Sequence, residues 1–344
     1  GPEVLRSQSP LVSSQISMSH FEDLKTSKPR DLSGVLVIDK TVGPTSHDVV
    51  TFARRSLGVS RIGHTGTLDP MATGVLPLVI GRATRLAQFL TASDKSYEAT
   101  IAFGRTTDTH DAAGTITGSS DRRPTREQLE ASLASFRGAF EQTPPVYSAK
   151  NIDGERSYDL ARKGKAATMQ RAKPVTVTVK HLEVLAFDGE TARLTMQVSA
   201  GFYVRALAHD LGDTLGCGAV LVGLRRTRAG EFGLDRAVPL ADVLQASRES
   251  LAGRLVPFRA LLPELPSVTL RSAAQLERLR NGVEMGPGDL VTPLLLPRDP
   301  APEAPSAAET PQVIVRLLGP DGDLVGLAKP AKTPGFLHGW VVLG

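Results

Sequence analysis

Hydrophobic residues first run together at residues 34–39 (GVLVID), a pattern typical of a short buried strand. A Gly-Pro turn follows, and apolar residues then recur at helical spacing up to Leu57. This spacing predicts a helix that is capped by Thr45 or Ser46 and ended by Gly58. Its apolar face consists of Val49, Val50, Ala53 and Leu57.

The same reasoning predicts a mixture of strands and helices further along the chain. Strands are expected at residues 75–80, 97–103, 175–187 and 194–199, and helices at about 83–90 and at 204–215. Thr125 and Gln128 form a capping-box pattern for a further helix that ends at Gly138. Residues 105–123 are rich in Thr, Asp, Gly and Ser, which predicts a loop. Because the elements alternate too irregularly for a doubly wound sheet, the pattern predicts an α+β fold.

The composition changes at both ends of the chain. Residues 1–31 are polar, Ser-rich and aperiodic, so we expect a disordered leader that opens on a Gly-Pro cloning remnant. We expect the main domain at residues 32–262. Residues 263–344 predict a helix and several strands, with a hairpin turn at residues 320–322. The Pro/Ala-rich segment 297–311 has the composition of a disordered loop or linker.

The overall composition fits one large domain and a small one, because 344 residues with 41% hydrophobic content can fill a core. No run of about 18 apolar residues appears and no basic-then-apolar signal opens the chain, so neither membrane insertion nor secretion is indicated. The single cysteine, Cys217, excludes an internal disulfide and a multi-cysteine metal site. We therefore expect a cytoplasmic protein.

The net charge of +4 is weak support for a nucleic-acid partner, but its distribution is uneven. Residues 150–173 contain seven Lys or Arg against three acidic residues, and a second basic group consists of Arg225, Arg226 and Arg228. A solvated face and a nucleic-acid surface both remain open as interpretations.

Several enzymatic motifs are missing from the sequence. There is no G-x-x-x-x-G-K-[ST] phosphate loop, no H-E-x-x-H or paired-cysteine zinc motif, and no G-x-S-x-G nucleophile turn. We therefore expect neither a metal nor a nucleotide cofactor.

Asp69 lies in the stretch Gly66-Thr67-Leu68-Asp69-Pro70, where the following proline favours an extended conformation for the aspartate. The glycines around it permit the close approach of another chain. The carboxylate is suited to a bulky ligand, but an aspartate that bonds to its own turn is an equally simple explanation. His64 has a similar alternative as a loop histidine bonded to a backbone carbonyl.

Seven stretches within residues 33–232 carry a more specific signal: GVLVIDK, GPTSHDVV, GHTGTLDPMATGVLPLVIGRATRL, DKSYEATIAFGRTTDTHDAAG, PPVYSAKNIDGERSYDLARKG, SAGFYVRALAHDLGDTLGCGA and LRRTRAGEF. In this order they resemble the motifs of the bacterial tRNA pseudouridine synthase B family. The resemblance implies a pseudouridine-synthase fold, with a mixed and mainly antiparallel central sheet flanked by helices. It also implies an inserted RNA-gripping arm at about residues 105–170 and, more loosely, a small β-rich PUA-like module at residues 263–344.

The implied activity is the cofactor-free isomerisation of the T-loop uridine at tRNA position 55 to pseudouridine. Asp69 matches the family's catalytic aspartate, and Arg205 matches the arginine that pairs with it. Tyr97 matches the tyrosine that stacks on the flipped uracil, although a strand tyrosine packed in the core is the alternative. Tyr203, expected on a strand edge, and Leu224, in the next strand, match contacts of the base pocket.

Further matches concern the binding of the RNA. His64 matches the histidine that inserts into the T loop, and Lys40 matches a substrate-binding position. The motif around Lys40 usually has Asp-Lys-Pro, whereas Thr41 stands here in place of proline. Lys163 and Lys165 fall in the implied arm, where basic side chains contact phosphates.

The implied partner is the T arm and T loop of tRNA, and we expect a monomer that needs no protein partner. Two other classes stay open: a relative that works inside a guide-RNA particle, and a non-catalytic tRNA-folding binder. The inserted arm argues against the first. The joint presence of Asp69, Tyr97 and Arg205 argues against the second.

The basic cluster at residues 150–173 generates a direct prediction. Neutralising Lys163 and Lys165 weakens tRNA binding and lowers the slope of log K against log salt by about one per lost phosphate contact. Binding measured over a series of salt concentrations checks this. An unchanged slope would identify the cluster as a solvated surface.

Overall fold

The computed structural model describes residues 32–145, 151–152, 155–156, 173–291 and 313–343. The expected leader and the Pro/Ala-rich segment 297–311 lie outside these residues, and so do Lys163 and Lys165. The predicted division of the chain at residue 262 stays a prediction.

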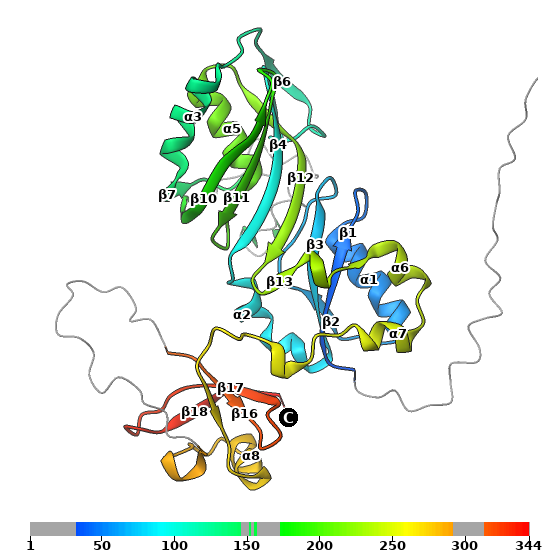
Figure 1. Cartoon of the computed structure of the whole chain (residues 1–344), viewed down its shortest axis with the longest axis vertical. Helices are drawn as coiled ribbons and strands as arrows, with labels where there is room; N and C mark the ends of the chain where they lie inside the picture. Colours follow the sequence, from blue (N-terminus) through cyan, green and yellow to red (C-terminus); the bar gives the residue numbers. More distant parts are fainter. Residues whose placement is uncertain (1–31, 146–150, 153–154, 157–172, 292–312, 344) are drawn as a thin grey trace, which may run out of the picture. The chain divides into compact units, whose positions relative to one another are not determined.

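A long, twisted sheet organises the chain (Figure 1). Within the described residues it has ten strands, in the order β14-β1-β3-β12-β4-β11-β10-β7, with β13 paired to β12 and β2 paired to β3. Only the β1–β14 and β12–β3 pairs of this described sheet are parallel. The strands are β1 (Gly34–Lys40), β2 (Ile62–His64), β3 (Thr73–Ile80), β4 (Lys95–Phe103), β7 (Gly138–Gln142), β10 (Val175–Phe187), β11 (Thr191–Val198), β12 (Ala219–Ala229), β13 (Phe232–Gly233) and β14 (Val238–Pro239). The prediction of a mixed and mainly antiparallel sheet is confirmed.

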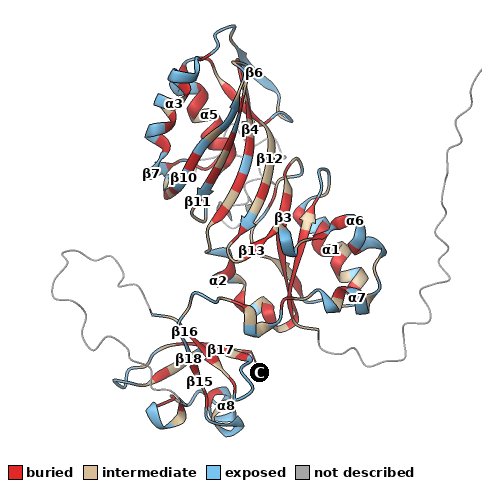
Figure 2. Ribbon diagram, in the orientation of Figure 1, coloured by how far each residue is buried: buried red, intermediate tan, exposed pale blue. Residues whose placement is uncertain are grey.

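The burial of the strands follows their hydrophobic patterns (Figure 2). Strands β1 and β3 are apolar almost throughout and are buried on both faces. In β4 and β11 the buried positions alternate with more exposed ones, as expected for strands with one covered face. The core therefore continues along the sheet from β1 to β11.

Two helices have the predicted bounds and ends. Helix α1 (Ser46–Leu57) begins with a complete capping box between Thr45 and Asp48, and it ends at Gly58, whose φ of 63° is left-handed. Helix α5 (Val204–Leu215) buries Leu207, Leu211 and Leu215. The remaining helices are α2 (Ala87–Thr91), α3 (Arg126–Leu133), α6 (Leu240–Gln245), α7 (Arg248–Gly253) and α8 (Ala273–Arg280), with 3-10 turns at Gly81–Leu86, Ala134–Phe136, Leu234–Arg236, Phe258–Ala260 and Pro287–Asp289.

The prediction of a loop at residues 105–123 is wrong, because strands β5 (Arg105–Thr107) and β6 (Ile116–Ser119) pair there. Their β-branched threonine and isoleucine residues favour strands in spite of the polar composition. The helix predicted to end at Gly138 ends at Leu133, and Gly138 instead opens a strand of the main sheet.

The expected arm at residues 105–170 is only partly described. Strand β7 pairs with β10, and α3 contacts α5, so both are parts of the main fold. Beyond them, β8 (Asn151–Ile152) and β9 (Glu155–Arg156) form a two-stranded pair. That this stretch grips RNA stays a prediction.

The C-terminal residues form a second sheet, in the order β15-β16-β17-β18. Its strands are β15 (Ser267–Thr269), β16 (Val315–Leu318), β17 (Leu324–Pro330) and β18 (Leu337–Val342). Strands β16 and β17 are antiparallel and flank the predicted turn, in which Gly322 has a φ of 79°. The expected helix and strands are confirmed. No helix in the described ranges is long and apolar enough to span a membrane.

Glu231 joins the turn after β12 to the chain near residue 262. Both of its carboxylate oxygens accept from the amide of Leu262, at 2.9 and 3.2 Å, and Leu262 has a left-handed φ of 57°. Burial raises the pKa of Glu231 from 4.5 to about 7, and the nearby carboxylate of Glu264 adds to the rise.

Because the pKa of Glu231 is higher in the folded state, its contribution to the free energy of unfolding is complete below about pH 4.5 and is lost as the pH rises through 7. Glu231→Gln keeps an acceptor for Leu262 and removes the titration. We expect the variant to be more stable than wild type at pH 8 and not at pH 5, as measured by urea unfolding. Exposed Glu183→Gln is the control, and equal pH dependence of wild type and Glu231→Gln would contradict the prediction.

Candidate active site

A cavity of about 280 Å³ opens where β4, β12 and the start of α5 meet the turn between β2 and β3. Five of the residues that the family resemblance assigns to the site line it: Asp69, Tyr97, Tyr203, Arg205 and Leu224. They come from four segments that are far apart along the chain. The structure therefore brings together the residues that the resemblance assigned to one site.

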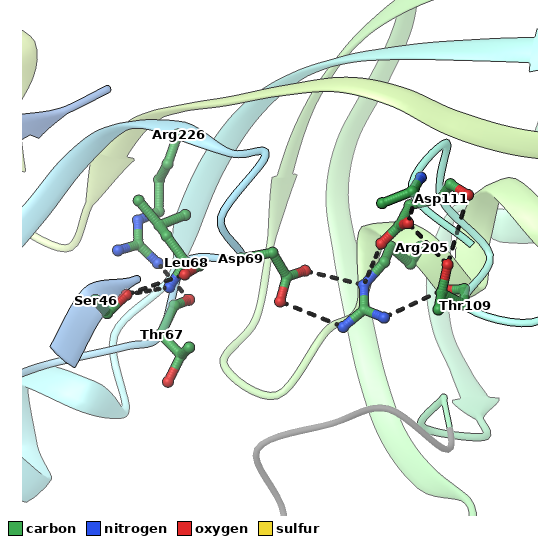
Figure 3. A network of polar contacts seen from close by, with 9 residues as sticks. Ser46, Thr67, Leu68, Asp69, Thr109, Asp111, Arg205 and Arg226 are labelled. Atoms are coloured by element: carbon green, nitrogen blue, oxygen red, sulfur yellow. Dashed lines mark hydrogen bonds and ion pairs between the residues drawn. The ribbon is translucent and has the colours of Figure 1, made fainter. Parts of the chain in front are cut away.

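The turn that carries Asp69 is fixed from inside the protein (Figure 3). The Ser46 hydroxyl accepts from the Leu68 amide at 2.8 Å and donates to the Leu68 carbonyl at 3.0 Å. The Leu68 side chain is buried in the core, and the Ala72 amide donates to the Asp69 carbonyl at 3.0 Å. Because the backbone on each side of Asp69 is held, the carboxylate projects from a rigid support.

Two buried cations bond to the backbone of the same segment. The Lys40 ammonium donates to the carbonyls of Ala72, Thr41 and Pro70 at 2.7, 2.9 and 3.3 Å. The Arg226 guanidinium donates to the carbonyls of Val75, Gly66 and Thr67 at 2.7, 3.0 and 3.4 Å. Burial lowers the pKa of Lys40 to about 8, while the charge of Asp69 acts in the opposite direction.

Lys40 is fully buried, and its ammonium lies on backbone carbonyls. It is absent from the residues that line the described cavity. This position supports a role in holding the Asp69 turn. That Lys40 binds substrate stays a prediction.

Asp69 and Arg205 form a bidentate ion pair. Arg205 Nε lies 2.9 Å from Asp69 Oδ2, and Arg205 Nη2 donates to Asp69 Oδ1 at 3.3 Å. The arginine side chain is 8% exposed and the aspartate side chain 34%, so the guanidinium forms the inner wall and the carboxylate faces the opening. Such paired bonds set both the distance and the plane of the carboxylate.

A second carboxylate and a carbonyl hold the other side of Arg205 (Figure 3). Arg205 Nη1 donates to the Thr109 carbonyl at 3.1 Å, and Arg205 Nε lies 3.8 Å from Asp111 Oδ2. The other Asp111 oxygen accepts from the Thr109 hydroxyl at 2.8 Å and from the Ala113 amide at 3.0 Å. Sequence reasoning missed Asp111, because it lies in the stretch that was predicted to be a featureless loop.

The tyrosines and Leu224 complete the cavity. Tyr97, on β4, is 8% exposed, packs in the core cluster and lines the cavity. That it stacks on the uracil stays a prediction. Tyr203 is the N-cap residue of α5, so its predicted place on a strand edge is wrong. The Gln142 side chain accepts from the Tyr203 amide at 2.8 Å and donates to the Tyr203 carbonyl at 3.1 Å, which fixes this end of the helix. Leu224 lies on β12 as expected.

His64 is the last residue of β2 and lies outside the cavity lining. Its Nδ1 accepts from the Gly66 amide at 3.4 Å, which ties the ring to the start of the Asp69 turn. The described residues contain no group of three or more His, Cys, Asp or Glu side chains arranged to hold a metal ion.

Comparisons with solved structures show the fold. The chain is similar to a protein in the structure of an H/ACA RNP bound to a substrate RNA containing 2′-deoxyuridine, with a TM-score of 0.65 and 23% identity over 90% of this chain and 85% of that one. It is also similar to a chain of a Cbf5-Nop10-Gar1 complex, with a TM-score of 0.63 and 26% identity over 87% of this chain and 78% of that one.

Sequence comparisons identify the family. Residues 54–204 match the model of the TruB family pseudouridylate synthase N-terminal domain, and residues 205–263 match that of the tRNA pseudouridylate synthase B C-terminal domain. The protein named tRNA pseudouridine synthase B in Solibacter usitatus is 44% identical to this chain, over 91% of this chain and all of that protein. The protein of the same name in Cupriavidus metallidurans is 41% identical, over 87% of this chain and 91% of that protein.

The fold and these matches define the chain as a pseudouridylate synthase. Within that class it belongs to the TruB family. The matched models end at residue 263, so the PUA-like nature of the residues beyond stays a prediction.

The buried ammonium of Lys40 generates a test of how the Asp69 turn is held. Lys40→Met keeps the volume but leaves three carbonyls without their donor, so we expect the free energy of unfolding to fall by about 2–4 kcal/mol. Urea unfolding measures this, with exposed Lys180→Met as the control. Equal stability of Lys40→Met and wild type would show that the ammonium does not support the turn.

Proposed function

We propose that the protein is a tRNA pseudouridine(55) synthase that isomerises the T-loop uridine of tRNA to pseudouridine. The observation that carries this proposal is the bidentate Asp69–Arg205 pair, which opens into a cavity shared with Tyr97, Tyr203 and Leu224. Relatives named tRNA pseudouridine synthase B, which align with most of the chain, support the same function.

The reaction breaks the N1–C1′ bond of uridine, turns the uracil and forms a C5–C1′ bond. The proton on C5 is lost to solvent and N1 gains a proton, so atoms and charge balance and no co-reactant is needed. Asp69 acts on the nucleotide: a carboxylate can attack it, remove a sugar proton or stabilise positive charge that develops at C1′.

The uracil is rejoined to the same sugar, so the second catalytic carboxylate of a glycoside hydrolase is unnecessary. Asp111 fits this view, because its oxygens are engaged by Thr109, Ala113 and Arg205 and because it does not line the cavity. Arg205 thus orients Asp69, and the pair is the catalytic unit.

The target uridine must leave the folded T loop to reach the cavity, at a cost of a few kcal/mol. Tyr97 stacks on the extruded base, an interaction worth about 1–3 kcal/mol, while Tyr203 and Leu224 form the other walls of its pocket. His64, at the edge of the Asp69 turn, enters the T loop in place of the base. Lys163 and Lys165 contact the tRNA backbone.

We expect the enzyme to act in the cytoplasm as a monomer, on the T arm and T loop, without cofactor, metal, protein partner or membrane. A guide-RNA particle is the alternative raised by the H/ACA structural neighbour, whose identity of 23% supports the fold alone. The relatives aligned over most of the chain favour the stand-alone enzyme.

The proposal predicts that Asp69→Asn abolishes product while tRNA binding stays nearly intact, because the amide cannot act as the carboxylate does. Release of tritium from a T-arm hairpin with 5-tritiated uridine measures the reaction, and filter binding measures affinity. Exposed Asp121→Asn is the matched control.

Full release by Asp69→Asn would overturn the catalytic role of Asp69. Binding of tRNA by the wild type with no release from any tRNA would favour a non-catalytic binder. Release that requires an added guide RNA would favour the particle.

A further inference from the structure

The loop that holds Arg205 contains a strained histidine. His110 has a φ of 62°, a left-handed conformation that is strained for a non-glycine residue. The loop is fixed to β12 from this residue onward, since the Leu221 amide donates to the His110 carbonyl at 3.1 Å and the Ala112 amide donates to the Leu221 carbonyl at 2.9 Å. Such strain persists only where surrounding contacts hold the residue in place.

The contact that accompanies this conformation is a stack of two imidazoles. The rings of His110 and His209 have centroids 3.9 Å apart and planes 13° apart. The Nδ1 atoms of both rings are buried and have no hydrogen-bond partner among the described residues. The two side chains therefore contact each other by stacking of the ring faces.

His209 lies one helical turn after Arg205 on α5, so the two side chains share a face of the helix. The loop meets the helix at both turns. At the first turn Thr109 and Asp111 bind Arg205, and at the second turn His110 stacks on His209. The middle residue of the loop thus fixes the two residues that hold the guanidinium.

We propose that His110 and His209 are positioning residues for pseudouridine formation: their stack sets the loop at residues 109–111, which orients Arg205 and through it the Asp69 carboxylate. This inference rests on the proposed function. It assigns a role in catalysis to two side chains that do not line the cavity.

Burial and the neighbouring groups keep the His110 ring neutral at neutral pH. Burial lowers the pKa of His110 to about 4, and the neighbouring His209 and Arg205 lower it further, against the opposing effect of Asp213 and Asp111. The acidic groups on the helix side are Asp213, whose Oδ2 lies 3.4 Å from His209 Nε2, and Asp210. At neutral pH the uncharged His110 ring can lie beside the guanidinium without repulsion.

The test compares His209→Phe, which keeps an aromatic ring, with His209→Ala, which removes it. The rate constant of a single turnover is measured by tritium release from the T-arm hairpin, together with the Kd for that RNA. We expect His209→Ala to be about 10–100-fold slower with an unchanged Kd, because small displacements of catalytic groups cost this much, whereas His209→Phe stays within about threefold of wild type. Exposed His181→Ala is the control and keeps the wild-type rate.

A double-mutant cycle adds a second measurement. His110→Asn tolerates the left-handed backbone and lacks the ring, and combining it with His209→Ala should slow the reaction no more than either change alone. If His209→Ala does not fold, His209→Leu replaces it, with the same expectation. A wild-type rate in His209→Ala, equal losses in His209→Phe and His209→Ala, or additive losses in the double variant would overturn the inference. A wild type that makes no pseudouridine would instead overturn the proposed function.

Discussion

The ion pair between Asp69 and Arg205 is the interaction around which the site is assembled. The proposed role of Asp69 requires a carboxylate held at one place and in one plane, and the two bonds from the guanidinium do both. The guanidinium is itself held by Thr109 and Asp111, so its position depends on helix α5 and on a loop fixed to β12. One interaction thus joins parts of the chain that are 136 residues apart.

The charges inside the protein explain how a polar site is supported next to an apolar core. Lys40 and Arg226 are buried, and backbone carbonyls accept their hydrogen bonds. Carbonyls satisfy the donors without adding a negative charge, so both cations raise the electrostatic potential around the Asp69 turn. This positive contribution favours the approach of a polyanionic RNA. The same cations donate hydrogen bonds to backbone carbonyls of the turn that have no partner in a regular sheet.

The sequence predicted the parts of the fold that depend on local signals. The capped ends of α1 follow from Thr45 and Gly58, and the buried faces of α1 and α5 follow from their spacing. The hairpin β5–β6 was not predicted, because its strands are held by pairing with each other and their polar composition is typical of a loop. Motif resemblance led to Asp69 and Arg205, which the structure pairs. It did not lead to Asp111 or Gln142, because their importance lies in contacts with residues more than 60 positions away.

The exchange of hydrogen bonds between Ser46 and Leu68 has a consequence for the cooperativity of the molecule. Ser46 belongs to the first turn of α1, and the Gly43 amide beyond β1 donates to the Pro70 carbonyl at 2.9 Å. The turn therefore cannot open without loosening the helix and the strand that form the core. We therefore expect its buried amides to unfold together with β1 and α1 and to exchange their hydrogens slowly. Because the core holds the Asp69 turn in place, the proposed extrusion of the uridine requires the RNA to change its conformation more than the turn.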